Sequence, residues 1–384
     1  MSIPEYRILV LGGTSAGKTT YLASMYHSLS TQGDNGFFLK TPSNDQSARL
    51  VATYSEMADK RRPFPKGNPL ADQAEWYFDC CVQYSGRTYT GCRFVYTDYA
   101  GARVDRVTAE RDVFDAAINR ADVLIGMLDG NKILSYLNNE DGSESYVLHD
   151  LAQICALLQS NTKNNRPLHF VLTKSDLFKG RYEFETVFNT LKQDCRPFRN
   201  LVTQYRASSC PVRCIPVSSV GEGFARREPN GEITKSGPRR IPRPEGVDAP
   251  LACVLPDILQ VRLQELAKQR NQTAASLPQG RPTLPWWAQI ANGVGGFLGG
   301  IPVRDLPAEL RVPAALFKSL GGVLERVATT EQAHVAARVR ELEQQRERAL
   351  SSVVSEEKAL AAITASFALI QHHLDRQYPE NVLR

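Results

Sequence analysis

The sequence has little of what secreted, zinc-binding or nucleic-acid-binding proteins usually contain. Only six of its 384 residues are histidine, and its eight cysteines are scattered without the spacing of a zinc motif. Its 46 basic and 41 acidic residues leave a net charge of +5, too small to indicate a nucleic-acid partner. We therefore expect buried thiols in a reducing compartment, and favour these over a zinc site built from Cys80, Cys81, Cys210 and Cys214.

Targeting and membrane signals are also scarce. The chain opens MSIPEYRILVLGG, without a basic region or cleavage site, and closes ENVLR, without a cysteine for prenylation, so we expect a cytoplasmic protein. Residues 284–303 carry no charge over a bilayer-spanning length, but five glycines and two prolines argue against a spanning helix. Trp286 and Trp287 within them favour a covered core edge, with peripheral membrane contact or a partner surface as alternatives.

Apolar runs alternate with helical stretches over the first two thirds of the chain. The runs are almost continuously hydrophobic, as strands buried on both faces of a parallel sheet are. They lie at residues 7–11, 93–97, 123–128, 168–173 and 212–217. Residues 75–84 and 89–97 predict a hairpin, and hence one antiparallel edge strand. Helices are predicted at residues 18–29, 103–119, 146–159, 183–205 and 249–268. The pattern predicts an α/β fold with a mostly parallel six-stranded sheet.

Changes in composition divide the chain further. Residues 226–248 are rich in proline, glycine and arginine, so we predict an exposed loop inserted in an α/β domain of residues 1–270. Its Arg239, Arg240 and Arg243 are alternative contacts for phosphate or acidic lipid.

A linker rich in glycine, proline and tryptophan is predicted at residues 271–306, and a helical region at residues 307–384. Apolar residues in the helical region recur every three or four positions and form one stripe. Arg346 and Glu357 interrupt this stripe, which favours a helical hairpin folded on the α/β domain over a sustained coiled coil.

The most specific motif, G-x-x-x-x-G-K-[ST], follows the first predicted strand and opens the first helix. Glycines in such a P-loop let backbone N–H groups turn toward phosphate oxygens, and the helix N-terminus adds positive potential. Its lysine reaches the outer phosphates, and its threonine offers a hydroxyl to Mg²⁺. The predicted phosphate-binding residues are Gly12, Gly13, Thr14, Ser15, Ala16, Gly17, Lys18, Thr19 and Thr20.

A D-x-x-G motif follows the strand at residues 93–97. Asp98 is expected at the carboxyl end of that strand, facing the P-loop, where it can hold a Mg²⁺-bound water. The backbone N–H of Gly101 can then approach the γ-phosphate and sense hydrolysis.

Two later strands end in residues suited to a purine base. Asp176, in the run that starts Thr173-Lys174, can accept hydrogen bonds from the N1 and N2 hydrogens of guanine, a donor pair that adenine lacks. The Lys174 stem can lie over the ring. Ser218 and Ser219 are placed to offer a backbone donor to guanine O6.

In this order, the four motifs resemble those of P-loop GTPases of the translation-factor-like class, and specifically Ras-like domains, over about residues 5–268. The resemblance implies a three-layer domain that binds GTP or GDP. It also implies Mg²⁺ contact by Thr19 and Asp98 and γ-phosphate sensing by Gly101.

The same resemblance assigns guanine selection to Lys174 and Asp176, although Thr173 stands where the family usually has asparagine. The long insertion and the fused helices resemble bacterial small-GTPase-like proteins.

Two departures from the family bear on catalysis. Ala102 stands where Ras-like enzymes often have a glutamine that orients water, and Thr14 crowds the approach of another residue, so we expect slow hydrolysis. Lys18 and Arg103 are the predicted catalytic residues, with pairing of Arg103 to Asp105 as the alternative.

The first switch, with its expected Mg²⁺ ligand, is predicted within residues 31–74. Thr41 and Thr53 are candidates for that ligand. Residues 62–69, where the switch should lie, contain no threonine, and Asn68 is the candidate replacement.

The sequence thus predicts a GTP-binding switch that hydrolyses GTP slowly and signals its nucleotide state to a protein partner through the C-terminal helices. The alternative is a scaffold or membrane or effector adaptor that holds nucleotide with little hydrolysis.

Overall fold

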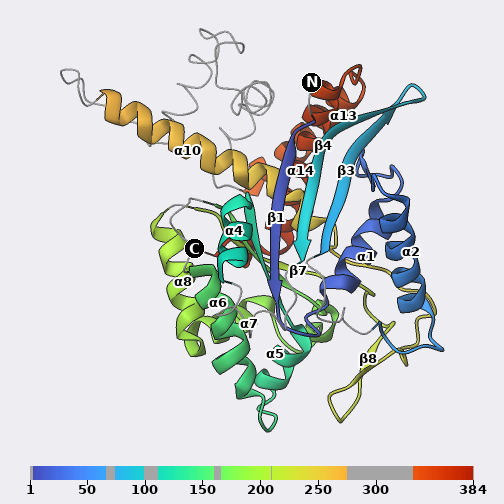
Figure 1. The fold of residues 1–384 in the computed structure, drawn as a ribbon, viewed down its shortest axis with the longest axis vertical. Helices are drawn as coiled ribbons and strands as arrows, with labels where there is room; N and C mark the ends of the chain where they lie inside the picture. The colour runs from blue at the N-terminus through green and yellow to red at the C-terminus, as the bar shows by residue number, and fades with distance from the viewer. Residues whose placement is uncertain are drawn as a thin grey trace.

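The computed structural model describes residues 3–65, 74–98, 111–159, 166–208, 210–274 and 332–383 (Figure 1). The strands are β1 (Glu5–Gly12), β2 (Phe38–Lys40), β3 (Ala74–Tyr84), β4 (Arg87–Asp98), β5 (Val123–Leu128), β6 (Leu168–Leu172), β7 (Val212–Pro216), β8 (Arg226–Arg227) and β9 (Ile233–Thr234). The helices are α1 (Lys18–Leu29), α2 (Asn44–Ala58), α4 (Arg111–Arg120), α5 (Gly130–Leu137), α6 (Ala152–Gln159), α7 (Phe184–Asp194), α8 (Arg196–Ala207), α9 (Ala249–Ala252), α10 (Val254–Ala274), α13 (Gln332–Leu350) and α14 (Glu356–Gln377). Single turns lie at Tyr146–Leu151 (π), Ser175–Phe178 and Pro379–Asn381 (both 3₁₀).

Seven strands form the central sheet in the order β2-β3-β4-β1-β5-β6-β7. β1 is parallel to β4 and β5, and the pairs β5–β6 and β6–β7 are also parallel. The antiparallel strand predicted from the hairpin is β3, and the short β2 covers its outer side. The predicted α/β fold class is therefore confirmed, with one strand more than expected, because three residues are too few to show a strand pattern.

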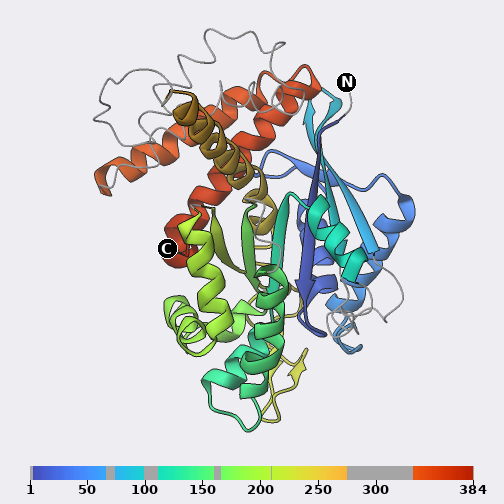
Figure 2. The same ribbon diagram turned by 60° about the vertical axis from the view of Figure 1, so that its left-hand side comes forward.

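Two helical layers enclose the sheet (Figure 2). Ile8 and Val10 of β1 join one core with α1, α2, α9 and α14, whereas Leu9 and Leu11 join the other with α4 to α8. This alternation follows from the two-residue period of a strand, which sends successive side chains to opposite faces. The apolar run of β1 is continuous because both of its faces are buried.

Several helix predictions were incomplete. α2 and α5 were not predicted, and the single helix expected at residues 183–205 is two helices, α7 and α8. The chain is extended at Cys195 (φ −102°, ψ 95°), and Pro197, the second residue of α8, has no backbone N–H with which to continue the old helix. Of the helix expected at residues 103–119, residues 103–110 lie outside the described residues.

The segment at residues 226–248, predicted to be an exposed loop, is partly buried instead. β8 and β9 pair as a small hairpin within it. Lys235 is only 8% exposed, and its Nζ donates to the backbone oxygens of Glu56, Asp59 and Pro63 at 2.7, 3.0 and 3.1 Å. The insertion thus holds the C-terminal end of α2, because the Lys235 ammonium group donates to carbonyl oxygens that have no partner within the helix.

α13 and α14 pack against each other, and α14 lies on β4 and β3. Ile363 and Phe367 of α14 are fully buried in the core that contains Ile8 and Val10. The rings of Phe367 and Phe37 pack edge to face, with 5.0 Å between their centroids. The helical hairpin expected to fold on the α/β domain is therefore present in the described part of the C-terminal region.

We expect Gly91→Ala to destabilise this contact. A Cβ atom at Gly91 would lie 2.7 Å from the backbone nitrogen of Leu360, so α14 would have to shift away from β4. Overpacking of this kind lowers the free energy of unfolding by about 1–3 kcal/mol. Urea denaturation measures the effect, with Gly33→Ala as control because a Cβ there meets nothing within 4 Å. Equal stability of the two variants would contradict close packing of α14 on β4.

All eight cysteines are buried and none is in a disulfide, which confirms the prediction of buried thiols. Within the described ranges, no group of three or more histidine, cysteine, aspartate or glutamate side chains is arranged to hold a metal ion. Among the helices that the structure describes, none has the length and apolarity to cross a membrane. Residues 284–303, with Trp286 and Trp287, lie outside the described residues.

Candidate functional site

The P-loop connects β1 to α1 at the carboxyl edge of the sheet. Ser15 and Gly17 both have positive φ angles, 67° and 85°, which turn the loop sharply before α1 begins at Lys18. Gly17 caps α1 without a side-chain hydrogen bond, so the first backbone N–H groups of the helix have no side-chain acceptor there. Such amides are suited to bind an anion.

Lys18 and Asp98 form the charged centre of this edge. Lys18 Nζ donates to the backbone oxygens of Gly12 and Gly13 at 2.8 and 3.3 Å. Burial lowers the pKa of Lys18, while the nearby Asp98 carboxylate opposes the shift. Asp98 ends β4 in register with Val10 of β1, so the sheet itself sets its place beside the P-loop.

One oxygen of the Asp98 carboxylate is buried without a hydrogen bond from the described residues. Asp98 is 9% exposed, and its Oδ1 has no hydrogen-bond partner among the described residues. Burial raises the pKa of this carboxyl group, with Lys18 acting in the opposite direction. A buried carboxylate oxygen without a partner is unfavourable by about 1–3 kcal/mol or more. The Asp98 carboxylate therefore fits Mg²⁺, which prefers oxygen ligands. Thr19, the other predicted ligand, is the second residue of α1, directly after Lys18.

The predicted base-binding residues meet at the ends of β6 and β7. Ser218 Oγ donates to Asp176 Oδ1 at 2.6 Å and accepts from the backbone N–H of Gly221 at 2.8 Å. Burial raises the pKa of Asp176, and the bond from Ser218 opposes this shift. The backbone oxygen of Ser219 accepts from Ser24 of α1 at 2.9 Å, so the loop after β7 is fixed to the helix that carries the P-loop. Thr173 follows β6 directly, and its hydroxyl donates to the backbone oxygen of Leu128, the last residue of β5, at 2.9 Å.

Lys174 joins the base-binding residues to the P-loop. Its Nζ donates to Ser15 O at 3.1 Å and to Asp129 Oδ1 at 2.7 Å. Sequence reasoning missed Asp129, which is 3% exposed and directly follows β5. A carboxylate placed just after a buried strand, at the same edge as the other motifs, was the signal that could have found it.

The remaining predicted residues either lie outside the part of the chain that the structure describes or bond locally. Gly101, Ala102, Arg103 and Asn68 lie outside the described residues. The two threonines considered for the first switch bond locally: Thr41 Oγ1 donates to Ser43 O at 2.9 Å. Thr53 Oγ1 likewise donates to Arg49 O at 2.8 Å within α2.

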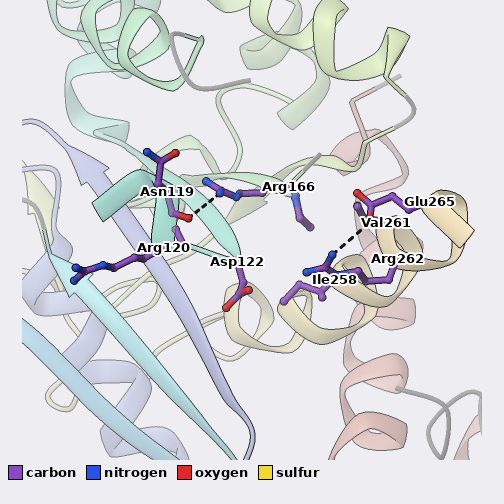
Figure 3. Close-up of a pocket in the computed structure, with 10 residues that line it drawn as sticks. Asn119, Arg120, Asp122, Arg166, Ile258, Val261, Arg262 and Glu265 are labelled. Atoms are coloured by element: carbon purple, nitrogen blue, oxygen red, sulfur yellow. Dashed lines mark hydrogen bonds and ion pairs between the residues drawn. The ribbon is translucent and has the colours of Figure 1, made fainter. Parts of the chain in front are cut away.

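A cavity of about 430 Å³ lies at the opposite edge of the sheet (Figure 3). Asp122 and Arg166 line it just before β5 and β6 begin, and Arg262 of α10 faces them. Arg262 pairs with Glu265 at 3.3 Å, and Arg166 donates to Asn119 O at 2.9 Å. Because parallel strands carry the P-loop at their carboxyl ends, this cavity is separate from the predicted nucleotide site.

The sequence model of the Double-GTPase 2 family matches residues 7–213, more than half of the chain. This chain belongs to the Double-GTPase 2 family. Family membership confirms the predicted P-loop GTPase domain and guanine-nucleotide binding as the general activity of this Double-GTPase 2 protein. No curated protein matches the chain.

Solved structures similar to this Double-GTPase 2 protein include the signal recognition particle receptor SRb-GTP/SRX complex from Chaetomium thermophilum, at 17% identity and a TM-score of 0.35. That match covers 58% of this chain and 94% of the other. A GTP-binding protein from Sulfolobus solfataricus in complex with GDP matches at 14% identity and a TM-score of 0.28, over 56% of this chain and 47% of the other. The FeoB G-domain from Methanococcus jannaschii matches at 13% identity and a TM-score of 0.26, over 56% and 88%.

Proposed function

We propose that this protein is a GTP-binding switch that hydrolyses GTP slowly. The observation that carries the proposal is the position of Asp176. Its carboxylate is held by Ser218 at the same sheet edge as the P-loop and is linked to that loop through Lys174. A buried acceptor at this place suits the paired donors of guanine.

In the proposed reaction, water attacks the γ-phosphate and the bond to the β-phosphate oxygen breaks. Lys18 and the backbone N–H groups that begin α1 stabilise the developing negative charge. Thr19 and Asp98 are the proposed Mg²⁺ ligands, and the ion, when bound, supplies positive charge at the phosphates. With Ala102 in place of a water-orienting glutamine, Arg103 is the proposed supplementary catalytic residue, and turnover is slow.

The proposed output passes to a protein partner through the C-terminal helices of a cytoplasmic protein. α14 lies on β4, the strand that ends in the proposed Mg²⁺ ligand Asp98, so a change at the nucleotide reaches α14 through one strand. Residues 271–306 are proposed as the linker to this region, and residues 307–384 as the region itself.

Calorimetry with GTP, GDP and ATP tests the proposed nucleotide preference. We expect the wild type to prefer guanine nucleotides and Asp176→Asn to weaken GTP binding by about tenfold to 100-fold, since a charged acceptor for two donors is lost. Xanthosine triphosphate, which has a carbonyl in place of the guanine amino group, should regain affinity for this variant. Asp150→Asn is the control, because Asp150 pairs with Lys132 at the surface, at 2.6 Å. Equal binding of ATP and GTP by the wild type, or none, would reject the proposal.

A further inference from the structure

The β8–β9 hairpin of the insertion is fixed to the beginning of α5. The Arg227 side chain is only 9% exposed, and its Nε donates to Asn131 Oδ1 at 2.7 Å. Its Nη2 donates to Ser135 Oγ at 2.8 Å and to Glu140 Oε2 at 2.6 Å. The hairpin also accepts from the same asparagine, since Asn131 Nδ2 donates to Gly231 O at 2.9 Å. Both ends of the Asn131 amide are therefore held by the insertion.

Asn131 connects the hairpin to Asp129. The backbone N–H of Asn131 donates to Asp129 Oδ1 at 3.0 Å, which caps α5. The same oxygen accepts from Lys174 Nζ at 2.7 Å, and the Asp129 N–H donates to Tyr146 Oη at 3.0 Å. One buried carboxylate oxygen thus joins the start of α5 to residues 173–176, the predicted base-binding loop after β6.

Lys174 completes the connection to the P-loop through its bond to Ser15 O. Both residues have left-handed backbones, with φ angles of 54° at Lys174 and 67° at Ser15. Such conformations are unfavourable for residues other than glycine, so neighbouring contacts must maintain them. The bonds from Lys174 to Asp129 and Ser15 are contacts of this kind.

We propose that Arg227 and Asp129 are positioning residues that slow nucleotide release. Arg227 fixes Asn131, Asn131 and Asp129 fix each other, and Asp129 holds Lys174 against Ser15. The insertion therefore stabilises the base-binding loop and the P-loop in one arrangement, although neither Arg227 nor Asp129 is assigned a nucleotide contact. This inference rests on the proposed guanine-nucleotide function of the site.

Dissociation rates of fluorescent GDP test the proposal on the full chain. We expect Arg227→Ala and Asp129→Asn each to speed release about tenfold, because the first removes the donor to Asn131 and the second replaces the carboxylate that holds the Lys174 ammonium group by a neutral amide. Arg226→Ala is the matched control, because the neighbouring Arg226 of the same hairpin is exposed, and its release rate should equal that of the wild type. Arg227→Lys, which can still donate to Asn131, should restore part of the slow release.

The double variant separates positioning from simple stability. Because both residues act through one connection, Arg227→Ala with Asp129→Asn should release GDP no more than about twice as fast as the faster single variant. Asn131→Ala cuts the same connection while leaving Ser135 and Glu140 as partners of Arg227. It should also release GDP faster, and it serves in place of Arg227→Ala if that variant does not fold.

Failure of the proposed function and failure of the positioning role give different results. If the wild type binds no guanine nucleotide, the proposed function fails. If the wild type binds GDP but the folded Arg227→Ala and Asn131→Ala variants release it at the wild-type rate, with only their unfolding free energies lowered, the positioning role is overturned and the proposed function stands.

Discussion

Lys18→Met is expected to weaken GTP binding by about 100-fold, since it removes the half-buried ammonium group of the P-loop and the charge-assisted bonds that we propose it makes to phosphate. In the structure, Lys18 Nζ satisfies two loop carbonyls and lies close enough to Asp98 to influence its ionisation. Without it, the buried Asp98 carboxylate loses its cation, so the pKa of Asp98 should rise further. Calorimetry with GTP and Mg²⁺ at neutral pH measures the loss.

Lys40→Met is the matched control, because Lys40 ends β2 as an exposed residue. It should bind GTP like the wild type. A Lys18→Met protein with native circular dichroism and unchanged GTP affinity would show that the loop does not hold phosphate.

Asp257→Asn is expected to lower the free energy of unfolding by about 3–5 kcal/mol, because it leaves Arg213 buried without its main counter-charge. Arg213 Nε and Nη2 donate to the two oxygens of Asp257 at 2.7 and 3.0 Å. His169 Nε2 lies 2.8 Å from Asp257 Oδ2, and Gln371 of α14 donates to Oδ1 at 2.9 Å. The carboxylate thus ties α10 to β6, β7 and α14.

Asp375→Asn is the control for this substitution. Asp375 accepts from the same arginine at 2.7 Å, but its side chain is 37% exposed, so water replaces much of the lost interaction. We expect a loss below about 1 kcal/mol there. Equal losses for the two variants in urea denaturation would contradict the central place of Asp257.

The stability difference should also depend on pH. Burial acts to raise the pKa of Asp257, but the Arg213 charge and the His169 contact outweigh it and lower the pKa to about 2. Because the unfolded pKa is near 3.8, the contribution of the carboxylate is fully present above about pH 5 and lost as pH falls toward 2. The margin in unfolding free energy by which the wild type exceeds Asp257→Asn should therefore shrink as the pH falls below about 4.

The C-terminal segment depends on the same arrangement. Arg213 Nη1 also donates to Asn381 Oδ1 at 3.0 Å, and Leu383 N–H donates to Val212 O at 2.9 Å. The end of the described chain therefore lies beside β7, as Figure 2 shows. Loss of Asp257 is expected to loosen this attachment as well, which hydrogen exchange at Leu383 would report.

Local patterns predicted the elements whose signal is contained in a few consecutive residues. The buried strands appear as apolar runs, and the P-loop is a fixed spacing of glycines before a lysine, so both were found. α2 was missed because its segment was assigned to the first switch, and only three of its residues are buried. α5 was missed because its eight residues are too few for a helical period to stand out.

The sequence by itself determined the α/β fold, the P-loop and the order of the motifs along the chain, because each depends on residues adjacent in the chain. Only the tertiary structure decided where buried charges find their partners. Arg227 binds Asn131 of α5, which lies 96 positions earlier in the chain, and Arg213 binds Asp375, which lies 162 positions later. A charged side chain loses its hydration on burial and is stable there only with a partner, and folding chooses that partner from distant parts of the chain. For this reason the arginine-rich insertion, predicted to be solvated, proved to be partly buried, and Asp129 was found only once the strands had brought it to Lys174.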